Sequence, residues 1–238
     1  MIDDAAVLIP AYQPCGRLAG LVSELRRDFS RILVVDDGST EGRDVIDSLG
    51  VEIVTHPRNM GKGAALRTGI SAILERWPDI SGAVTADADG QHLAKDIVRV
   101  AKRLVEDASH GTVRLVLGVR RIGREAPFKS RFANEWTRIL FRFFAGYAAS
   151  DTQTGLRGIP AALFERVASL PGDRYDFETR MLVDAKGHPS LPVEIPIETI
   201  YIDGNKSSHF RPFADTLSTQ GALWGAGLRR IFAGGARK

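Results

Sequence analysis

Short apolar runs alternate with stretches of helical periodicity through the first half of the chain. The runs that predict strands cover residues 5–10, 31–35, 51–55, 83–85 and 113–117. Between them, apolar residues recur at helical spacing, for example at Leu18, Leu21, Val22 and Leu25. This alternation favours parallel strands joined by right-handed crossovers, with helices on both faces. We therefore expect an α/β fold with a mainly parallel, Rossmann-like sheet whose ligands bind at the carboxyl ends of the strands.

The second half of the chain begins with a basic segment and an aromatic stripe. Five basic residues lie close together in a turn-rich stretch: Arg120, Arg121, Arg124, Lys129 and Arg131. The apolar residues that follow fall on one helical face: Trp136, Ile139, Leu140, Phe143, Phe144 and Tyr147. This pattern fits a core helix. It equally fits a helix that lies in a bilayer interface beside a basic patch.

The remaining segments add a turn, a helix, a strand and a tail. DTQTGLRGIP, residues 151–160, predicts a glycine-bearing turn with Asp151 at its start and Arg157 near its end. Residues 175–186 predict a helix that carries Glu178, and residues 191–202 alternate like a strand. The last loop, residues 203–212, contains several side chains that could donate hydrogen bonds to a phosphate, among them Lys206. The tail, 217–238, predicts weakly amphipathic helices with a basic end.

Composition argues against several classes of protein, among them nucleic-acid-binding, disulfide-bonded and membrane-spanning proteins. The net charge of +3 is too small to indicate nucleic acid as a partner. One cysteine, Cys15, excludes an internal disulfide and a cysteine zinc cage and fits a reducing compartment. No stretch approaches the roughly 20 apolar residues of a membrane span, and the N-terminus does not resemble a signal peptide. We expect a cytoplasmic protein, with association to a membrane surface left open.

The acidic stretch Gly82–His92 carries the strongest chemical signal. Asp87, Asp89 and Gln91 occupy alternate positions directly after a predicted strand, so an extended chain would direct their oxygens to one side. Carboxylate and amide oxygens suit a hard divalent cation such as Mg or Mn. The alternative is an acidic turn that caps the next helix.

Three further loops should reach the same sheet edge. Pro10 and Tyr12 could present an aromatic face to a nucleobase, while Asp36 or Asp37 could accept hydrogen bonds from a base or ribose. In the third loop, Lys62 and the backbone amides at a helix start suit a phosphate. Each loop also has an ordinary structural interpretation, as loop packing, a helix cap or a solvated charge.

Taken in order, these segments resemble the family 2 glycosyltransferases with the GT-A fold. Within that family, the chain especially resembles the polyprenyl-phosphate sugar synthases, such as the dolichol-phosphate mannose and glucose synthases. The strings that carry it are VLIPAYQP, ILVVDDGST, NMGKGAALRTGI, VTADADGQH, DTQTGLRG and FETRMLVDAKG. The resemblance implies a metal-dependent, inverting transfer of a hexose from a UDP- or GDP-linked sugar to a polyprenyl phosphate.

The resemblance also implies an organisation of the chain. It predicts one GT-A domain over residues 1–238, with a nucleotide-sugar-binding half at 1–118 and an acceptor- and membrane-facing half at 119–238. The protein would act in the cytoplasm, peripherally on the cytoplasmic face of the membrane.

Site residues follow from the same resemblance. The predicted nucleotide-binding set is Pro10, Tyr12, Asp36, Asp37, Lys62 and Asp87. The metal, Mg or Mn, would be held by Asp87, Asp89 and Gln91, and the acceptor phosphate by Arg120, Arg131 and Lys206. The catalytic candidates are Asp89, Arg120 and Lys206, joined by Asp151 or Glu178 as the base for an alcohol acceptor.

Some features differ from the polyprenyl-phosphate pattern. The last loop has the order Gly204, Asn205, Lys206, Ser207, Ser208, and a long hydrophobic C-terminal anchor is missing. The alternative is therefore the same donor chemistry with a saccharide or other soluble acceptor. Two more distant alternatives are a sugar-phosphate nucleotidyltransferase and a non-catalytic nucleotide-sugar-binding module.

Overall fold

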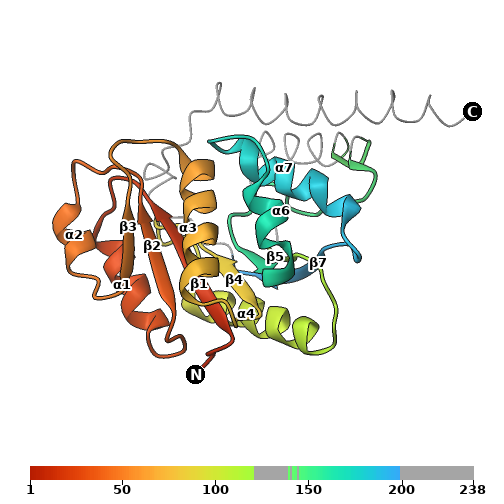
Figure 1. Cartoon of the computed structure of the whole chain (residues 1–238), viewed down its shortest axis with the longest axis horizontal. Coiled ribbons are helices and arrows are strands. Elements are labelled where there is room, and N and C mark those ends of the chain that lie inside the picture. Colours follow the sequence, from red (N-terminus) through yellow and green to blue (C-terminus); the bar gives the residue numbers. More distant parts are fainter. Residues whose placement is uncertain (121–138, 140, 144, 199–238) are drawn as a thin grey trace, which may run out of the picture.

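A computed structural model describes residues 1–120, 139, 141–143 and 145–198. Within these ranges, seven strands form one sheet in the order β3-β2-β1-β4-β6-β5-β7 (Figure 1). The strands are β1 (Ala5–Ala11), β2 (Ile32–Asp36), β3 (Glu52–Thr55), β4 (Gly82–Thr85), β5 (Val116–Arg120), β6 (Arg157–Pro160) and β7 (Val193–Ile197). The predicted α/β fold with a mainly parallel sheet is confirmed.

The centre of the sheet is parallel and buried on both faces. β1 pairs in parallel with β2 and with β4, and β2 pairs in parallel with β3. Every residue of β1 is buried, so its side chains serve two cores. Leu8 belongs to one hydrophobic cluster, whereas Val7 and Ile9 belong to the other. This explains why β1 is a continuous apolar run rather than an alternating one.

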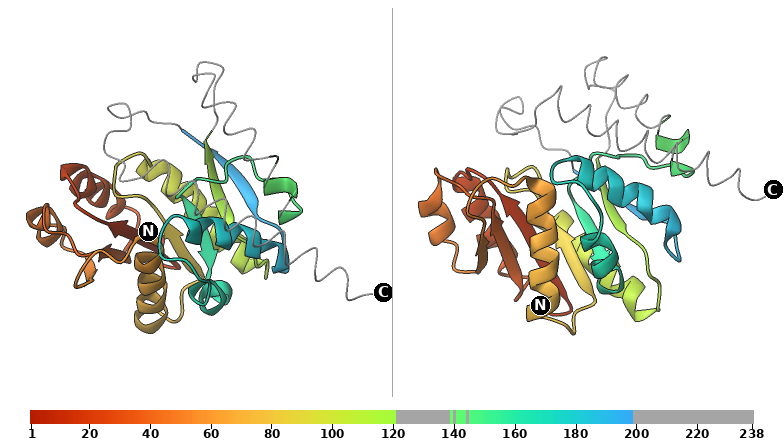
Figure 2. Two further views of the ribbon diagram at one scale, coloured as in Figure 1. Left: turned by 90° about the horizontal axis from the view of Figure 1, so that it is seen from above. Right: turned by 45° about the horizontal axis from the view of Figure 1, so that its top comes forward.

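Helices cover both faces of this sheet (Figure 2). The cluster around Leu8 contains residues of α3 (Lys62–Arg76), α6 (Phe164–Ala168) and α7 (Asp176–Asp184). The cluster around Val7 contains residues of α1 (Gly16–Leu25) and α4 (Ala94–Ser109). The other helical elements of the described residues are α2 (Arg43–Asp47), η1 (Ala161–Leu163) and η2 (Ala185–Gly187). The layers place the starts of α3 and α7 at the carboxyl edge of the central strands.

The segment Arg157–Pro160 corrects one prediction. The sequence predicts a turn there, but these four residues form β6, which lies antiparallel between β4 and β5. A strand this short, with Gly158 inside it and Pro160 at its end, lacks a periodic pattern of its own. It is held by pairing with strands far away in sequence. The predicted strand at 113–117 likewise lies slightly later, at Val116–Arg120.

The predicted boundary between the halves, at residue 118, falls inside β5. The division into a nucleotide-sugar half and an acceptor half stays a prediction.

The predicted aromatic stripe is divided between surface and interior. Ile139 and Phe143 are 54% and 69% exposed, whereas Phe141, outside the predicted stripe, is fully buried. Phe141 meets the Tyr147 ring edge to face at 5.2 Å, and the Tyr147 hydroxyl donates to the Leu182 carbonyl at 2.6 Å. Two of the predicted stripe residues therefore do not belong to the core. Trp136, Leu140, Phe144 and the predicted tail helices at 217–238 lie outside the described residues.

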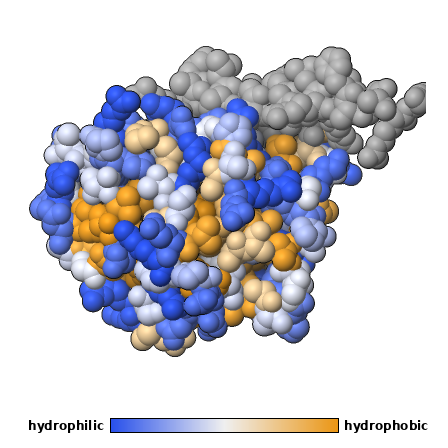
Figure 3. All heavy atoms as spheres, viewed as in Figure 1, coloured by the Kyte–Doolittle hydropathy of each residue, from blue (hydrophilic) through white to orange (hydrophobic). Residues whose placement is uncertain are grey.

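The visible surface carries mixed polar and apolar residues. On the face shown in Figure 3, apolar areas are interrupted by hydrophilic side chains across the described part. Among the helices of that part, none has both the length and the apolar composition needed to cross a bilayer.

Candidate active site

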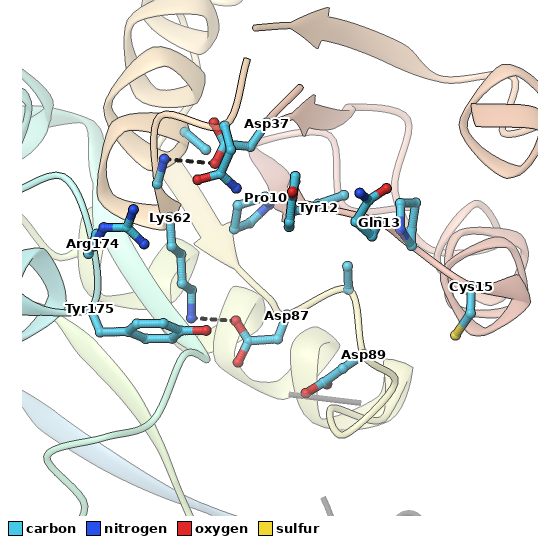
Figure 4. Close-up of a pocket in the computed structure, with 16 residues that line it drawn as sticks. Pro10, Tyr12, Gln13, Cys15, Asp37, Lys62, Asp87, Asp89, Arg174 and Tyr175 are labelled. Atoms are coloured by element: carbon cyan, nitrogen blue, oxygen red, sulfur yellow. Dashed lines mark hydrogen bonds and ion pairs between the residues drawn. The ribbon is translucent and has the colours of Figure 1, made fainter. Parts of the chain in front are cut away.

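A pocket of about 620 Å³ opens at the carboxyl edge of β1, β2 and β4. Its walls come from the loops that follow these strands, from the start of α3 and from the segment before α7 (Figure 4). Its polar and charged side chains are those of Tyr12, Gln13, Cys15, Asp37, Asn59, Lys62, Asp87, Asp89, Arg174 and Tyr175. The structure thus brings together the predicted residues Pro10, Tyr12, Asp37, Lys62, Asp87 and Asp89.

The loop after β1 is tied to the loop after β2. Gln13 has a left-handed backbone with φ of 50°, and its N–H donates to Ser39 Oγ at 3.0 Å. Its side-chain oxygen accepts the Glu41 N–H at 2.6 Å. A left-handed residue other than glycine persists where neighbouring contacts fix it, as these bonds do here. They hold Pro10 and Tyr12 at the wall of the pocket.

The two neighbouring aspartates occupy different places. Asp36 is buried, and its Oδ1 accepts the Ser39 N–H at 2.9 Å. It is not among the residues that line the pocket. Asp37 does line the pocket and accepts the N–H groups of Met60 and Gly61, both at 2.8 Å. His56 Nδ1 lies 2.7 Å from Asp37 Oδ1, so Asp37 fixes the loop that leads into α3.

Lys62 forms ion pairs with two carboxylates at the pocket. Its Nζ lies 2.6 Å from Asp87 Oδ1 and 3.2 Å from Glu178 Oε1. The ammonium also lies 5.5 Å from the centre of the Tyr175 ring, on which it can make a cation–π contact. Burial alone would lower the pKa of Lys62, but the two carboxylates raise it above its ordinary value. Lys62 therefore stays charged, and it links the acidic loop after β4 to α7.

The pKa values of the two aspartates in the acidic loop are shifted in opposite directions. Burial opposes ionisation of Asp87, yet the Lys62 ammonium outweighs it and lowers the Asp87 pKa to about 2. Burial and the neighbouring Asp87 charge both raise the pKa of Asp89. Mutually repelling carboxylates at one pocket wall fit a divalent cation, which would relieve the repulsion. The described residues hold no cluster of three or more His, Cys, Asp and Glu suited to a metal.

Local hydrogen bonds shape this acidic loop. Asp89 Oδ1 accepts the Gln91 N–H at 2.9 Å, and His92 Nδ1 accepts the Asp87 N–H at 3.1 Å. Burial lowers the pKa of His92, which keeps its ring neutral and able to accept. Gln91 is not among the lining residues. Its predicted role as a third metal ligand, like the metal itself, stays a prediction.

A second ion pair lies next to this pocket, at the end of β5. Arg120 Nε donates to Asp151 Oδ2 at 2.7 Å, and Arg120 Nη2 donates to Asp151 Oδ1 at 3.2 Å. This two-bond geometry fixes the plane of the guanidinium. The Arg120 charge also contributes to lowering the pKa of Asp87, so it acts on the acidic loop. Arg131 and Lys206, the other predicted acceptor-phosphate residues, lie outside the described residues.

Comparison with known proteins identifies the family. Residues 6–169 match the family described as Glycosyl transferase family 2. The chain belongs to this family. An uncharacterised protein of Methanocaldococcus jannaschii is 29% identical over 208 residues, covering 86% of this chain and 85% of that protein. A UDP-N-acetylglucosamine--dolichyl-phosphate N-acetylglucosaminyltransferase of Methanococcus voltae is 27% identical, covering 83% of this chain and 86% of the relative.

Solved structures support the GT-A fold. Mannosyl-3-phosphoglycerate synthase of Rubrobacter xylanophilus superimposes with a TM-score of 0.66 at 19% identity, covering 98% of this chain and 76% of that one. Glucosyl-3-phosphoglycerate synthase of M. tuberculosis gives 0.60 at 16% identity, covering 95% and 77%. The chain is thus a glycosyltransferase with the GT-A fold.

Several residues of this glycosyltransferase site escape sequence reasoning. Arg174 and Tyr175 line the pocket. Arg174 precedes the predicted helix, Tyr175 is its first residue, and neither carries a motif spacing. Arg157 is buried in β6 and donates to the carbonyls of Thr154 at 2.9 Å and Glu178 at 2.5 Å. The sequence places Arg157 near the end of the string DTQTGLRG but does not predict its burial or these two hydrogen bonds.

Proposed function

We propose that this glycosyltransferase moves a hexose from a UDP- or GDP-linked sugar to a polyprenyl phosphate, in a metal-dependent reaction with inversion. The observation that carries the proposal is the arrangement of Asp87, Asp89 and Lys62 in one pocket beside the Arg120–Asp151 pair. The acceptor class is supported by the Methanococcus voltae relative, whose name specifies dolichyl phosphate. Inversion is implied by the family resemblance alone.

On the donor side, the chain supplies recognition and charge. Pro10 and Tyr12 offer an apolar and aromatic wall for the base. Asp87 and Asp89 would hold Mg or Mn, which supplies stabilisation of the negative charge that develops on the leaving diphosphate. Lys62, held between Asp87 and Glu178, contributes a second positive charge at the same place. We propose Gln91 as a further ligand of this metal ion.

On the acceptor side, the ion pairs favour a phosphate over an alcohol. An alcohol needs a general base, whereas an ionised phosphate is already nucleophilic. The two candidate bases, Asp151 and Glu178, are paired with Arg120 and Lys62 at 2.7 Å and 3.2 Å. We infer that both carboxylates position cations rather than remove protons. Arg120 then faces the acceptor phosphate, and Arg131 and Lys206 complete its proposed binding set.

Nucleotide release tests the donor and acceptor assignments together. UDP-glucose, UDP-N-acetylglucosamine and GDP-mannose are each incubated with Mg or Mn, with and without a short polyprenyl phosphate. We expect one donor to release nucleotide only with the lipid phosphate and the metal, and Asp89→Asn to lose that release. Release that ignores the lipid but needs Asp89 would favour a soluble acceptor. Full release by Asp89→Asn would contradict the metal site.

A further inference from the structure

The segment between α6 and α7 is attached to the first turns of α3. Arg67 of α3 donates to the carbonyls of Leu170 at 3.2 Å and Gly172 at 2.5 Å, and it pairs with the Asp173 carboxylate. Its guanidinium lies 5.5 Å from the centre of the Phe177 ring. One side chain therefore contacts three residues of the segment and the start of α7. Arg67 is not among the residues that line the pocket.

Two glycines allow the close approach that these bonds need. A Cβ on Gly61 would lie 2.3 Å from the Asp173 carbonyl oxygen, and one on Gly63 would lie 2.6 Å from Phe177 Cβ. The Ala64 N–H donates to the Asp173 carbonyl at 3.1 Å. The glycine and arginine positions of NMGKGAALR therefore form a docking surface for residues 170–177.

The docked segment carries Arg174 into the pocket. Arg174 and Lys62 line the same cavity, and Figure 4 shows the Arg174 side chain extending toward Lys62. The Lys62 charge is shared by Asp87 and Glu178. Arg174, by contrast, makes no ion pair with any residue in the described ranges. Its guanidinium therefore adds positive charge to the pocket wall beside the start of α3.

Three backbone amides around the start of α3 already donate to groups of the protein. The N–H groups of Met60 and Gly61 donate to Asp37, and that of Ala64 donates to the Asp173 carbonyl. These three amides are therefore engaged within the protein. An anionic ligand at this wall would also meet the side-chain cations of Lys62 and Arg174. A guanidinium suits a diphosphate because its donors match phosphate oxygens in pairs.

We propose that Arg174 binds the diphosphate of the nucleotide sugar and that Arg67 is the positioning residue that holds Arg174 at the pocket. The proposal rests on the proposed glycosyl transfer from a nucleotide sugar. It adds a specificity element in which the segment before α7 distinguishes a nucleoside diphosphate from the nucleoside alone. Arg174 contacts the ligand, whereas Arg67 acts only through the segment that it fixes.

Binding of nucleosides and their diphosphates tests the role of Arg174. The dissociation constants of uridine, UDP, guanosine and GDP are measured by calorimetry with Mn. The wild type should prefer one diphosphate over its nucleoside, and Arg174→Met should reduce that preference by about tenfold, as expected for one charge-assisted hydrogen bond. Nucleoside affinity should not change. An Arg174→Met protein that keeps the full preference overturns this inference alone, whereas a wild type without any diphosphate preference overturns the proposed function as well.

The positioning role of Arg67 needs a separate readout. Arg67→Met should reduce the diphosphate preference to the same extent, and the double variant with Arg174→Met should show no further loss. Arg67→Lys should not restore the preference, because an ammonium cannot reproduce the guanidinium's paired donors. The control is Arg76→Met, because Arg76 lies in the last turn of α3 and forms an exposed ion pair with Glu52. Its Nη1 lies 3.5 Å from Glu52 Oε2. Additive losses, or an equal effect of Arg76→Met, would contradict the role of Arg67.

Discussion

Individual charges in the pocket are balanced by partners that come from different elements. Lys62 begins α3, Asp87 follows β4, and Glu178 lies in α7. The sequence predicts Lys62, Asp87 and Asp89 at one sheet edge, because each follows a strand or begins a helix in a parallel pattern. It does not predict that Glu178 pairs with Lys62. That contact depends on how residues 170–177 dock on α3, which no local spacing encodes.

Replacing Lys62 by methionine should destabilise the protein by about 1–3 kcal/mol, because Asp87 and Glu178 would lose their shared cation. The free energy of unfolding in urea measures this directly. Lys102→Met in α4 is the control, since Lys102 is exposed, and it should change that free energy by less than about 0.5 kcal/mol. Equal stability of the two variants would show that the Lys62 pairs contribute nothing.

Replacing Asp89 should stabilise the protein, whereas replacing Lys62 should destabilise it. Its pKa is raised by burial and by Asp87, so the ionised carboxylate opposes folding at neutral pH. Asp89→Asn keeps an oxygen for the Gln91 N–H and removes the charge. We expect its melting temperature at pH 7 to exceed that of the wild type without metal. The difference should close as the pH falls below about 4, the ordinary pKa of an aspartate. A lower melting temperature at pH 7 would contradict this charge balance.

At the scale of elements, the parallel strands are predictable and β6 is not. β1, β2 and β4 are apolar runs separated by helical periodicity, so their pairing follows from general rules. β6 has only four residues and takes its place from β4 and β5. The start of α3 shows the same limit. The sequence suggests a phosphate-binding helix end there, which stays a prediction, but gives no sign that the segment before α7 docks on it.

Gly63→Ala tests that docking surface. A Cβ at residue 63 would meet Phe177 Cβ at 2.6 Å and the carbonyl oxygens of Gly172 and Arg174 at 2.8 Å and 2.9 Å. We expect a loss of about 1–3 kcal/mol in unfolding free energy, as for overpacking of a core. Gly20→Ala in α1 is the matched control, because a Cβ there has no neighbour within 4 Å. It should raise stability by about 0.5–1 kcal/mol. A Gly63→Ala protein as stable as Gly20→Ala would contradict the close approach.

At the scale of the whole molecule, β5 leads from the edge of the pocket to the basic segment that spans residues 120–131 of the sequence. Arg120 ends β5 beside the pocket, and the rest of the basic segment follows it in the sequence. The two exposed apolar side chains Ile139 and Phe143 follow the basic segment in sequence. We propose that this region contacts the membrane surface on the cytoplasmic face, where a polyprenyl phosphate would be available.

Vesicle flotation tests this membrane contact. The wild type should float with vesicles that contain anionic phospholipid, and high salt should weaken the association. The double variant Ile139→Glu, Phe143→Glu should lose most of it, because both side chains would become charged. Leu191→Glu is the control, since Leu191 is 51% exposed in the segment before β7. Equal flotation of all three proteins would place the contact elsewhere.

We propose that the acceptor is a phosphate and that its transfer needs no general base. The most direct test is to follow a labelled hexose from the accepted donor into lipid, using a polyprenyl phosphate and the matching polyprenol in parallel. We expect a glycosylated product from the phosphate and none from the alcohol, because Asp151 and Glu178 are held by Arg120 and Lys62. Comparable transfer to the polyprenol, lost in Asp151→Asn or Glu178→Gln, would show that one of these carboxylates acts as a general base on an alcohol acceptor.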